Sequence, residues 1–184
     1  MKYWSKSSLT IYKYLSSMTN TVDKVVLDIG KNSNFNNTQM YRGTYFQAHK
    51  MIEFMDRKRK MVNLKIAVDD AINRLDKNNK RLLTLVFFDG VKCETVAKIL
   101  SVSLRTFFRK KVNALKQFEL ILQAIGYDTE YFEREYSKER WFMAVYDECV
   151  SKRNDSDEIL DKCLVKRVFN EVSRVQFKFN TYLT

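Results

Sequence analysis

The residues whose types and spacing could do chemistry are basic side chains on one stretch near the middle of this chain. Arg105, Arg109 and Lys116 recur at intervals that place them on one side of an α-helix. The guanidinium group of arginine can donate two hydrogen bonds at once to O6 and N7 of guanine, and recognition helices present such arginines near their N-terminal ends. The spacing therefore predicts a helix that reads base edges in the major groove of DNA.

The other side of the same stretch is apolar, so the basic side is expected to face solvent. The apolar positions are Phe107, Ala114, Phe118 and Ile121, and Val112 falls between the basic residues. Lys111 interrupts the apolar stripe, and we expect its amine to reach solvent from a buried stem. The pattern is typical of a helix that packs on a core by one side only.

A shorter helix is predicted immediately upstream, joined to this one by a tight turn. Its apolar face would consist of Val96, Ile99 and Leu100. Ala97 is expected where the two helices cross, because only a small side chain fits at a close crossing. Ser101 and Val102 would make the turn, with Val102 in the core, and Ser103 would cap the second helix.

The expected DNA contacts divide by role. Arg105 and Arg109 would read bases, whereas Lys92, Lys98 and Lys110 would meet phosphates. The complete set of expected DNA-binding residues is Lys92, Lys98, Ser103, Arg105, Thr106, Arg109, Lys110 and Lys116. Double-stranded DNA is the partner that this set predicts.

The distribution of charge favours a polyanionic partner for the first two thirds of the chain. The net charge is +11, from 33 Lys and Arg against 22 Asp and Glu. Residues 1–75 carry a balance of +7 and the much shorter span 76–118 carries +7 again, while residues 119–184 carry −3. A uniform bias of composition toward lysine would not leave the last third acidic, so the positive potential is concentrated in the first two thirds of the chain.

The composition favours an all-α protein with reduced cysteines. The 184 residues include no proline and only four glycines, whereas β-rich folds need both residues at turns. The three cysteines are too widely spaced for a zinc or redox pair, so free thiols in a cytoplasmic protein are expected. No apolar run of about 18 residues is present to span a membrane, and the N-terminus does not resemble a signal peptide.

Apolar periodicity predicts further helices on both sides of the pair. Those upstream are expected at about 7–30, from 38 to the basic run at 57–60, at 64–75 and at 80–88. The last of these would be capped by Asn78 or Asn79. Downstream, helices are expected at about 129–151 and, from a capping-box pattern at Asp155 and Glu158, at about 157–179.

Residues 66–118 resemble region 4 of the bacterial RNA polymerase sigma factors, and the smaller phage and plasmid late-transcription regulators that share this module. The matching elements, in order, are AVDDAINRL, KRLLTLVFFDG, ETVAKIL and VSLRTFFRKKVNAL. The pair Phe107–Phe108 followed by three cations is closer to the phage-type regulators, and Ser101 departs from the family, which usually has glycine at the turn. The resemblance implies an all-α fold with a helix-turn-helix core, flanked by N- and C-terminal helices, and sequence-specific regulation of transcription. It also implies a contact with RNA polymerase.

The elements divide the chain into three segments. These are an N-terminal helical segment at 1–62, a DNA-binding domain at 63–127 and an acidic two-helix segment at 128–184. A full sigma factor would also need a region that melts and reads the −10 promoter element, and residues 1–60 lack its aromatic-and-basic helix. A stand-alone regulator is therefore favoured over a divergent sigma factor. A helical adaptor that binds only proteins would require the side of Arg105 and Arg109 to be covered or neutralised.

Nothing in the sequence predicts catalysis, a metal site or a cofactor. The single histidine, His49, has no nucleophile or metal-ligand set at a recognisable spacing. Asp69 and Asp70 are adjacent on a helix, so their side chains diverge and cannot act as an acid–base pair. We therefore expect a binding protein and not an enzyme.

Two features leave alternatives open. The stripe of the last helix consists of Leu160, Leu164, Val168, Val172, Val175 and Phe179. It could bury against a second copy and form a homodimer, or pack on the N-terminal helices of its own chain. The basic run at 57–60 could be a solvated helix end or a phosphate contact.

Overall fold

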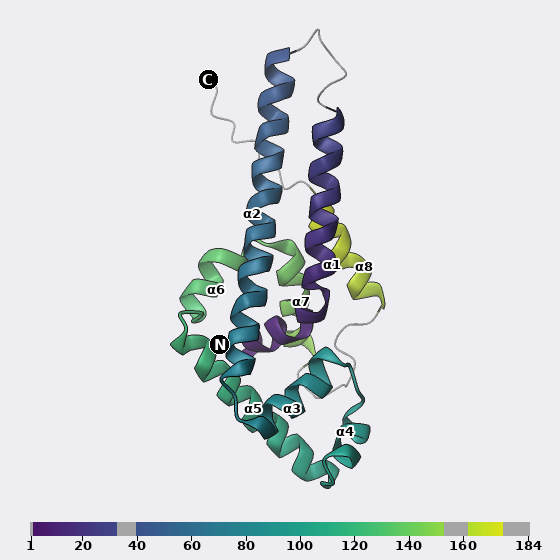
Figure 1. Cartoon of the computed structure of the whole chain (residues 1–184), viewed down its shortest axis with the longest axis vertical. Coiled ribbons are helices and arrows are strands. Elements are labelled where there is room, and N and C mark those ends of the chain that lie inside the picture. Colours follow the sequence, from purple (N-terminus) through teal and green to yellow (C-terminus); the bar gives the residue numbers. More distant parts are fainter. Residues whose placement is uncertain (1, 33–39, 153–161, 175–184) are drawn as a thin grey trace.

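The described residues of the computed structural model, 2–32, 40–152 and 162–174, form helices without any strand (Figure 1). The helices are α1 Lys2–Asn32, α2 Met40–Asn73, α3 Lys77–Leu83, α4 Cys93–Ile99, α5 Leu104–Ala124, α6 Thr129–Tyr136, α7 Arg140–Ser151 and α8 Lys162–Ser173. A π-helical turn, η1 Thr84–Phe88, continues α3. The all-α prediction is confirmed for this part of the chain, in which no helix is long and apolar enough to cross a membrane.

Helices α1 and α2 form an antiparallel pair whose far end projects beyond the other helices (Figure 1). Three side-chain contacts fix their alignment. Lys58 Nζ donates to Asp23 Oδ1 at 2.6 Å, Lys65 Nζ donates to Ser16 Oγ at 2.7 Å, and the Tyr12 hydroxyl donates to Asp69. From one contact to the next, the number of residues moved toward the N-terminus of α1 equals the number moved toward the C-terminus of α2, as expected for antiparallel helices. Burial and the hydrogen bond to Asp69 raise the pKa of Tyr12 to about 12, so this contact persists through neutral pH.

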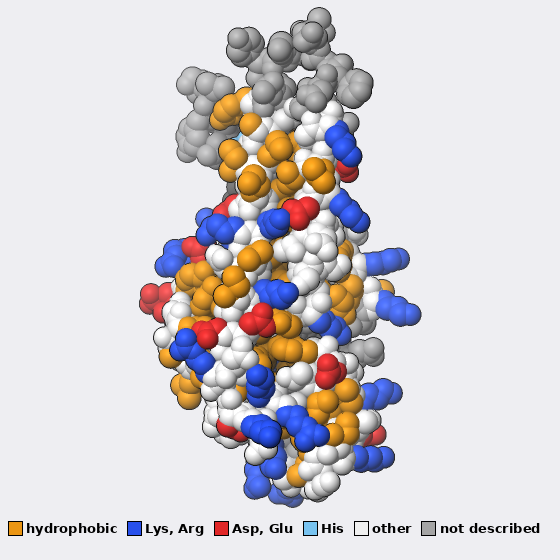
Figure 2. Space-filling view, in the orientation of Figure 1, with side chains coloured by type: hydrophobic (Ala, Val, Ile, Leu, Met, Phe, Trp, Pro, Cys, Tyr) orange, Lys and Arg blue, Asp and Glu red, His pale blue; other side chains and the backbone are white. Residues whose placement is uncertain are grey.

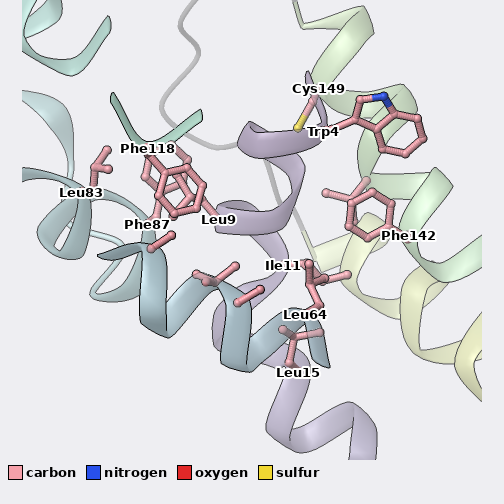
Figure 3. Close-up of a cluster of buried hydrophobic side chains, with 14 of the residues drawn as sticks. Trp4, Leu9, Ile11, Leu15, Leu64, Leu83, Phe87, Phe118, Phe142 and Cys149 are labelled. Atoms are coloured by element: carbon pink, nitrogen blue, oxygen red, sulfur yellow. The ribbon is translucent and has the colours of Figure 1, made fainter. Parts of the chain in front are cut away.

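Helix α1 also joins the two ends of the core. Leu9 lies beside Phe87 and Phe118, with Leu83 beyond these rings, whereas Trp4 lies toward Phe142 and Cys149 (Figure 3). The Trp4 ring stacks on Phe132 at 5.5 Å and on Phe142 at 5.9 Å between centroids. Because one helix supplies both clusters, the part of the chain around α5 and the C-terminal helices share a continuous core.

Helix α2 is longer than the sequence predicted. It passes through the basic run at 57–60 and the expected start at 64 without interruption, so the expected boundary between residues 62 and 63 lies inside one helix. No proline or glycine between residues 44 and 73 interrupts it. The four cations of the run pair within the chain, as Arg57–Glu53 (2.8 Å), Lys58–Asp23 (2.6 Å), Arg59–Asp56 (2.6 Å) and Lys60–Glu139 (2.7 Å).

Arg57 connects α2 to the end of α8. Its side chain is only 2% exposed, and its Nη1 atom donates to the carbonyl oxygens of Val172 at 2.6 Å and Arg174 at 2.9 Å. The last carbonyl groups of a helix have no hydrogen-bond donor inside that helix, and the Arg57 guanidinium supplies one to the carbonyls of Val172 and Arg174. The Nη2 atom donates to Glu53 Oε1 at 2.8 Å, which keeps the buried charge paired.

The predicted helix at 129–151 is wrong, because it is two helices separated at Glu139. The Glu139 backbone is extended, with φ −85° and ψ 98°, and its carboxylate is buried. Lys60 Nζ donates to Oε1 at 2.7 Å, and Trp141 Nε1 donates to Oε2 at 2.9 Å. Burial alone would lower the pKa of Lys60, but the hydrogen bonds to Glu139 and Asp56 outweigh it and raise that pKa. The break between α6 and α7 therefore lies at the residue whose carboxylate meets Lys60 of α2.

Two further expectations concern the N-terminal cap of α3 and the apolar stripe of the last helix. The cap of α3 is Asp76, not Asn78 or Asn79, because Asp76 Oδ2 accepts from the backbone N–H groups of both asparagines at 3.1 Å. The described part of the last stripe, Leu164, Val168 and Val172, is buried, and α8 packs on α1 and α7 of its own chain. The intrachain arrangement therefore holds for these three residues. Asp155, Glu158, Leu160, Val175 and Phe179 lie outside the described residues.

We predict that Arg57→Met destabilises the fold by about 3 kcal/mol, because it leaves a buried network without its cation. Methionine keeps the apolar stem, so the loss reports the guanidinium and not the packing. The matched control is Arg74→Met, whose exposed pair with Asp70 should contribute less than about 1 kcal/mol. Urea denaturation followed by circular dichroism measures both free energies of unfolding. Equal losses for the two variants would contradict the importance given to Arg57.

Candidate nucleic-acid interface

The turn between α4 and α5 depends on the backbone of Ser101. This residue has φ of 53°, in the left-handed region that side chains other than glycine rarely adopt. Its N–H donates to the carbonyl of Lys98 at 3.0 Å, and the N–H of Val102 donates to the carbonyl of Ala97 at 3.0 Å. These two bonds are the Schellman motif that ends many helices. Ala97 is buried and Val102 packs against the core, as the sequence predicted.

Ser103 begins α5 in the predicted way. Its Oγ atom accepts the backbone N–H of Thr106 at 3.2 Å, and its hydroxyl donates to Thr106 Oγ1 at 2.9 Å. An N-cap of this kind satisfies one of the free N–H groups of the first turn. Ser103 is exposed and Thr106 half-buried, and their hydroxyl groups hold each other.

The two sides of α5 differ as predicted. Phe107, Ala114 and Phe118 are fully buried, and α5 packs on α1, α2, α3 and α4. On the opposite side Arg105, Arg109 and Lys116 are exposed. Val112, between them, is 50% exposed. The core therefore orients α5 so that its arginines project into solvent.

The cations of this surface are not neutralised within the described part of the chain. Lys92, Lys98, Arg105, Arg109, Lys110 and Lys116 are all exposed. Among the described residues none of these six forms an ion pair, in contrast with the run at 57–60. Figure 2 shows Lys and Arg side chains gathered at the end of the molecule formed by α3, α4 and the start of α5. We call these six residues the cationic surface.

Lys111 does not belong to the cationic surface, and the expectation that its amine reaches solvent is wrong. The residue is 6% exposed, and its Nζ atom donates to the sulfur of Cys93 at 3.6 Å. The same amine lies 5.7 Å from the centroid of the Phe108 ring, whose face attracts a cation. Cys93 is the first residue of α4, so this contact ties α4 to α5 from inside.

Two residues differ from the expected surface. Ile99 was assigned to the apolar face of α4, but it is 44% exposed, because Leu100 takes the inward place at the end of this short helix. Asn113, which the sequence reasoning missed, is exposed on α5. It follows Arg109 by four residues, and that spacing was the available signal. An asparagine amide can bond N6 and N7 of adenine.

No family model matches the chain, and no curated protein or solved structure matches it either. The resemblance to sigma region 4 therefore rests on the residues quoted for it. Within the described residues, no group of three or more His, Cys, Asp and Glu side chains is placed to hold a metal ion.

We predict that Ser101→Gly stabilises the chain by about 0.5–1 kcal/mol, because glycine adopts a positive φ without steric cost. The matched control is Ser151→Gly at the end of α7, where the backbone is helical. Glycine there should destabilise by a few tenths of a kcal/mol to about 1 kcal/mol. Thermal unfolding by calorimetry compares the variants. A destabilising Ser101→Gly would show that the turn differs from the one described.

Proposed function

We propose that this chain is a sequence-specific DNA-binding regulator of transcription. In this proposal α4, the turn at 100–102 and α5 act as a helix-turn-helix of the sigma region 4 type. The observation that carries the proposal is the pair Arg105 and Arg109, exposed and without an ion pair among the described residues, near the start of a helix that the core holds by its other side. Unpaired guanidinium groups at that place suit guanine edges in the major groove.

The other cations would fix the position of α5 on the duplex. Lys92 precedes α4 and Lys98 lies in its last turn, so both can reach the phosphates on one side of the groove. Lys110 and Lys116 would meet the backbone along α5. The start of α5, where Ser103 and Thr106 bond to each other, is a second phosphate site in this proposal, because the free N–H groups of a first helical turn attract anions. Contacts of this kind give affinity without selecting a sequence.

The proposal includes no catalysis, metal or cofactor, and it places the activity in the cytoplasm. A contact with RNA polymerase enters through the resemblance to sigma region 4 alone. A divergent sigma factor is less well supported, because residues before 60 that would have to melt a promoter are engaged in the α1–α2 pair and its core. Leu9, Leu15 and Phe54 are buried, so this segment forms part of the hydrophobic core.

A helical adaptor that binds proteins is the second candidate. Val112 is 50% exposed and Leu120 is 63% exposed on the same side of α5 as the arginines, and apolar side chains of that kind can anchor a protein partner. Under the DNA proposal Val112 would instead contact the methyl group of a thymine. The uncovered charge of Arg105 and Arg109 favours DNA over the adaptor.

The test is the affinity of the full chain for duplex DNA as a function of salt and of single substitutions. The logarithm of the binding constant should fall steeply with the logarithm of salt concentration, since each phosphate contact releases counterions. Lys98→Ala should weaken all sequences alike and lower the slope by about one. Arg105→Ala and Arg109→Ala should cost about 1–3 kcal/mol on a preferred sequence and relax the base preference.

The matched control is Arg167→Ala, an exposed arginine on α8 in the acidic part of the chain. It should leave the affinity and its salt slope unchanged. A flat salt response would remove the DNA proposal. Equal behaviour of the lysine and arginine variants would show that α5 is not the helix that reads bases.

A further inference from the structure

Helix α2 carries a second apolar stripe, on a side that does not face the core. Its members are Tyr45, Ala48, Ile52, Met55, Arg59, Val62 and Ile66, which alternate in steps of three and four residues. Five of them are strongly exposed apolar side chains, at 78% for Tyr45, 65% for Ile52, 62% for Met55, 39% for Val62 and 61% for Ile66. We call these seven residues the outer stripe.

The spacing of the outer stripe is that of a coiled-coil seam. Apolar residues at alternating steps of three and four keep one line of a helix against a partner helix over its whole length. The core-facing stripe of the same helix, which includes Phe54, Met61, Leu64 and Val68, is separate and fully buried. Figure 2 shows hydrophobic side chains gathered over the projecting part of α1 and α2. Apolar side chains exposed along one line of a helix, here interrupted only by Arg59, are a feature of interaction surfaces.

A groove of about 340 Å³ adjoins the lower half of the outer stripe, between α1 and α2. Its lining consists of Leu15, Ser16 and Thr19 from α1 and Met61, Val62, Lys65, Ile66 and Asp69 from α2. The other half of the stripe, which includes the exposed Tyr45 and Ile52, lies toward the N-terminal end of α2. At that end α1 and α2 project beyond the other helices (Figure 1). One molecule thus offers both a groove and exposed apolar side chains along the same line.

We propose that the outer stripe binds a second copy of this chain, with the two α2 helices antiparallel. A two-fold axis near residue 57 then makes the contact close on itself. It brings Ile52 of each copy level with Val62 of the other, and the small Ala48 level with Ile66. Tyr45 of each copy reaches the level of Asp69. The exposed apolar side chains of each copy thereby meet the groove of the other.

Charge complementarity selects this orientation. Antiparallel pairing places Arg59 opposite Met55 and beside Asp56 of the second copy. The two arginines and two aspartates then alternate around the axis, and within one copy Arg59 already pairs with Asp56 at 2.6 Å. Parallel pairing would instead stack Arg59 on Arg59 and set Asp69 against Asp69, and such like-charge layers are destabilising.

The orientation has a consequence that rests on the proposed function. The C-terminal ends of the two α2 helices, at Asn73, would lie roughly 50 Å apart along the pair, from 1.5 Å per residue. The two α4–α5 units then sit at opposite ends of the dimer. This separation exceeds the spacing of about 34 Å between half-sites one DNA turn apart. The dimer would therefore not bind one short palindrome with half-sites a single turn apart.

The first test is the solution mass of the full chain at tens of micromolar, by sedimentation equilibrium without DNA. The expected result is a dimer that Ile52→Glu weakens at least tenfold. The matched control, Leu120→Glu, removes an equally exposed leucine from α5 and should leave the dimer intact. A wild-type chain that stays monomeric would overturn the proposal, whatever covers the stripe instead. Because DNA is absent, this outcome is independent of the proposed function.

The second test is orientation, by disulfide cross-linking in a Cys163→Ser background, which removes the exposed cysteine among the described residues. The pair Ile52→Cys with Val62→Cys should give a covalent dimer on oxidation. Ile52→Cys alone should not, because residue 52 lies roughly 15 Å from its symmetry mate in the antiparallel pair. Efficient cross-linking of the single variant, or none of the double variant, would overturn the antiparallel arrangement.

Discussion

A buried guanidinium has to be paired where it lies, and that constraint organises this molecule around Arg57. Its partners come from two directions: Glu53 on the same helix, and the last carbonyls of α8 at 2.6 and 2.9 Å. Glu139, 3.7 Å from the Arg57 Nε atom, adds the junction between α6 and α7. These contacts hold α2 against the C-terminal helices, and α1 packs between them and α5. Helix α5 packs by its apolar side on α1, α2, α3 and α4, which leaves its basic side outward.

The two groups of cations differ in a way that local spacing explains. In the run at 57–60, Glu53 and Asp56 stand three or four residues before Arg57, Arg59 and Lys60, at the distance where helical side chains meet. No acidic residue stands three or four positions from Arg105 or Arg109. Charges paired within the chain contribute to the stability of the fold, whereas unpaired cations create a positive potential that attracts an anionic partner. Net charge alone would not separate the two groups.

Three features were predictable from the sequence: the pair of α4 and α5, the cap at Ser103 and the two sides of α5. Each follows from periodicity or from residues within one helical turn. The continuity of α2, the break at Glu139 and the burial of Lys111 were not predictable. Glu139 meets Lys60 across 79 residues of sequence, and Lys111 meets Cys93 across 18. The periodicity of a sequence carries no information on a partner that far away. A lysine in an apolar stripe, such as Lys111, is therefore expected to reach solvent unless the structure shows a buried acceptor.

Selection from a pool of random duplexes tests most directly the proposal that the cationic surface reads a DNA sequence. The full chain would be incubated with the pool at physiological salt, and bound duplexes would be recovered and sequenced over several rounds. The account predicts enrichment of one short motif, with its strongest positions lost when Arg105 and Arg109 are both replaced by alanine. Recovery of bound DNA without an enriched motif, or the same motif from the double variant, would contradict it.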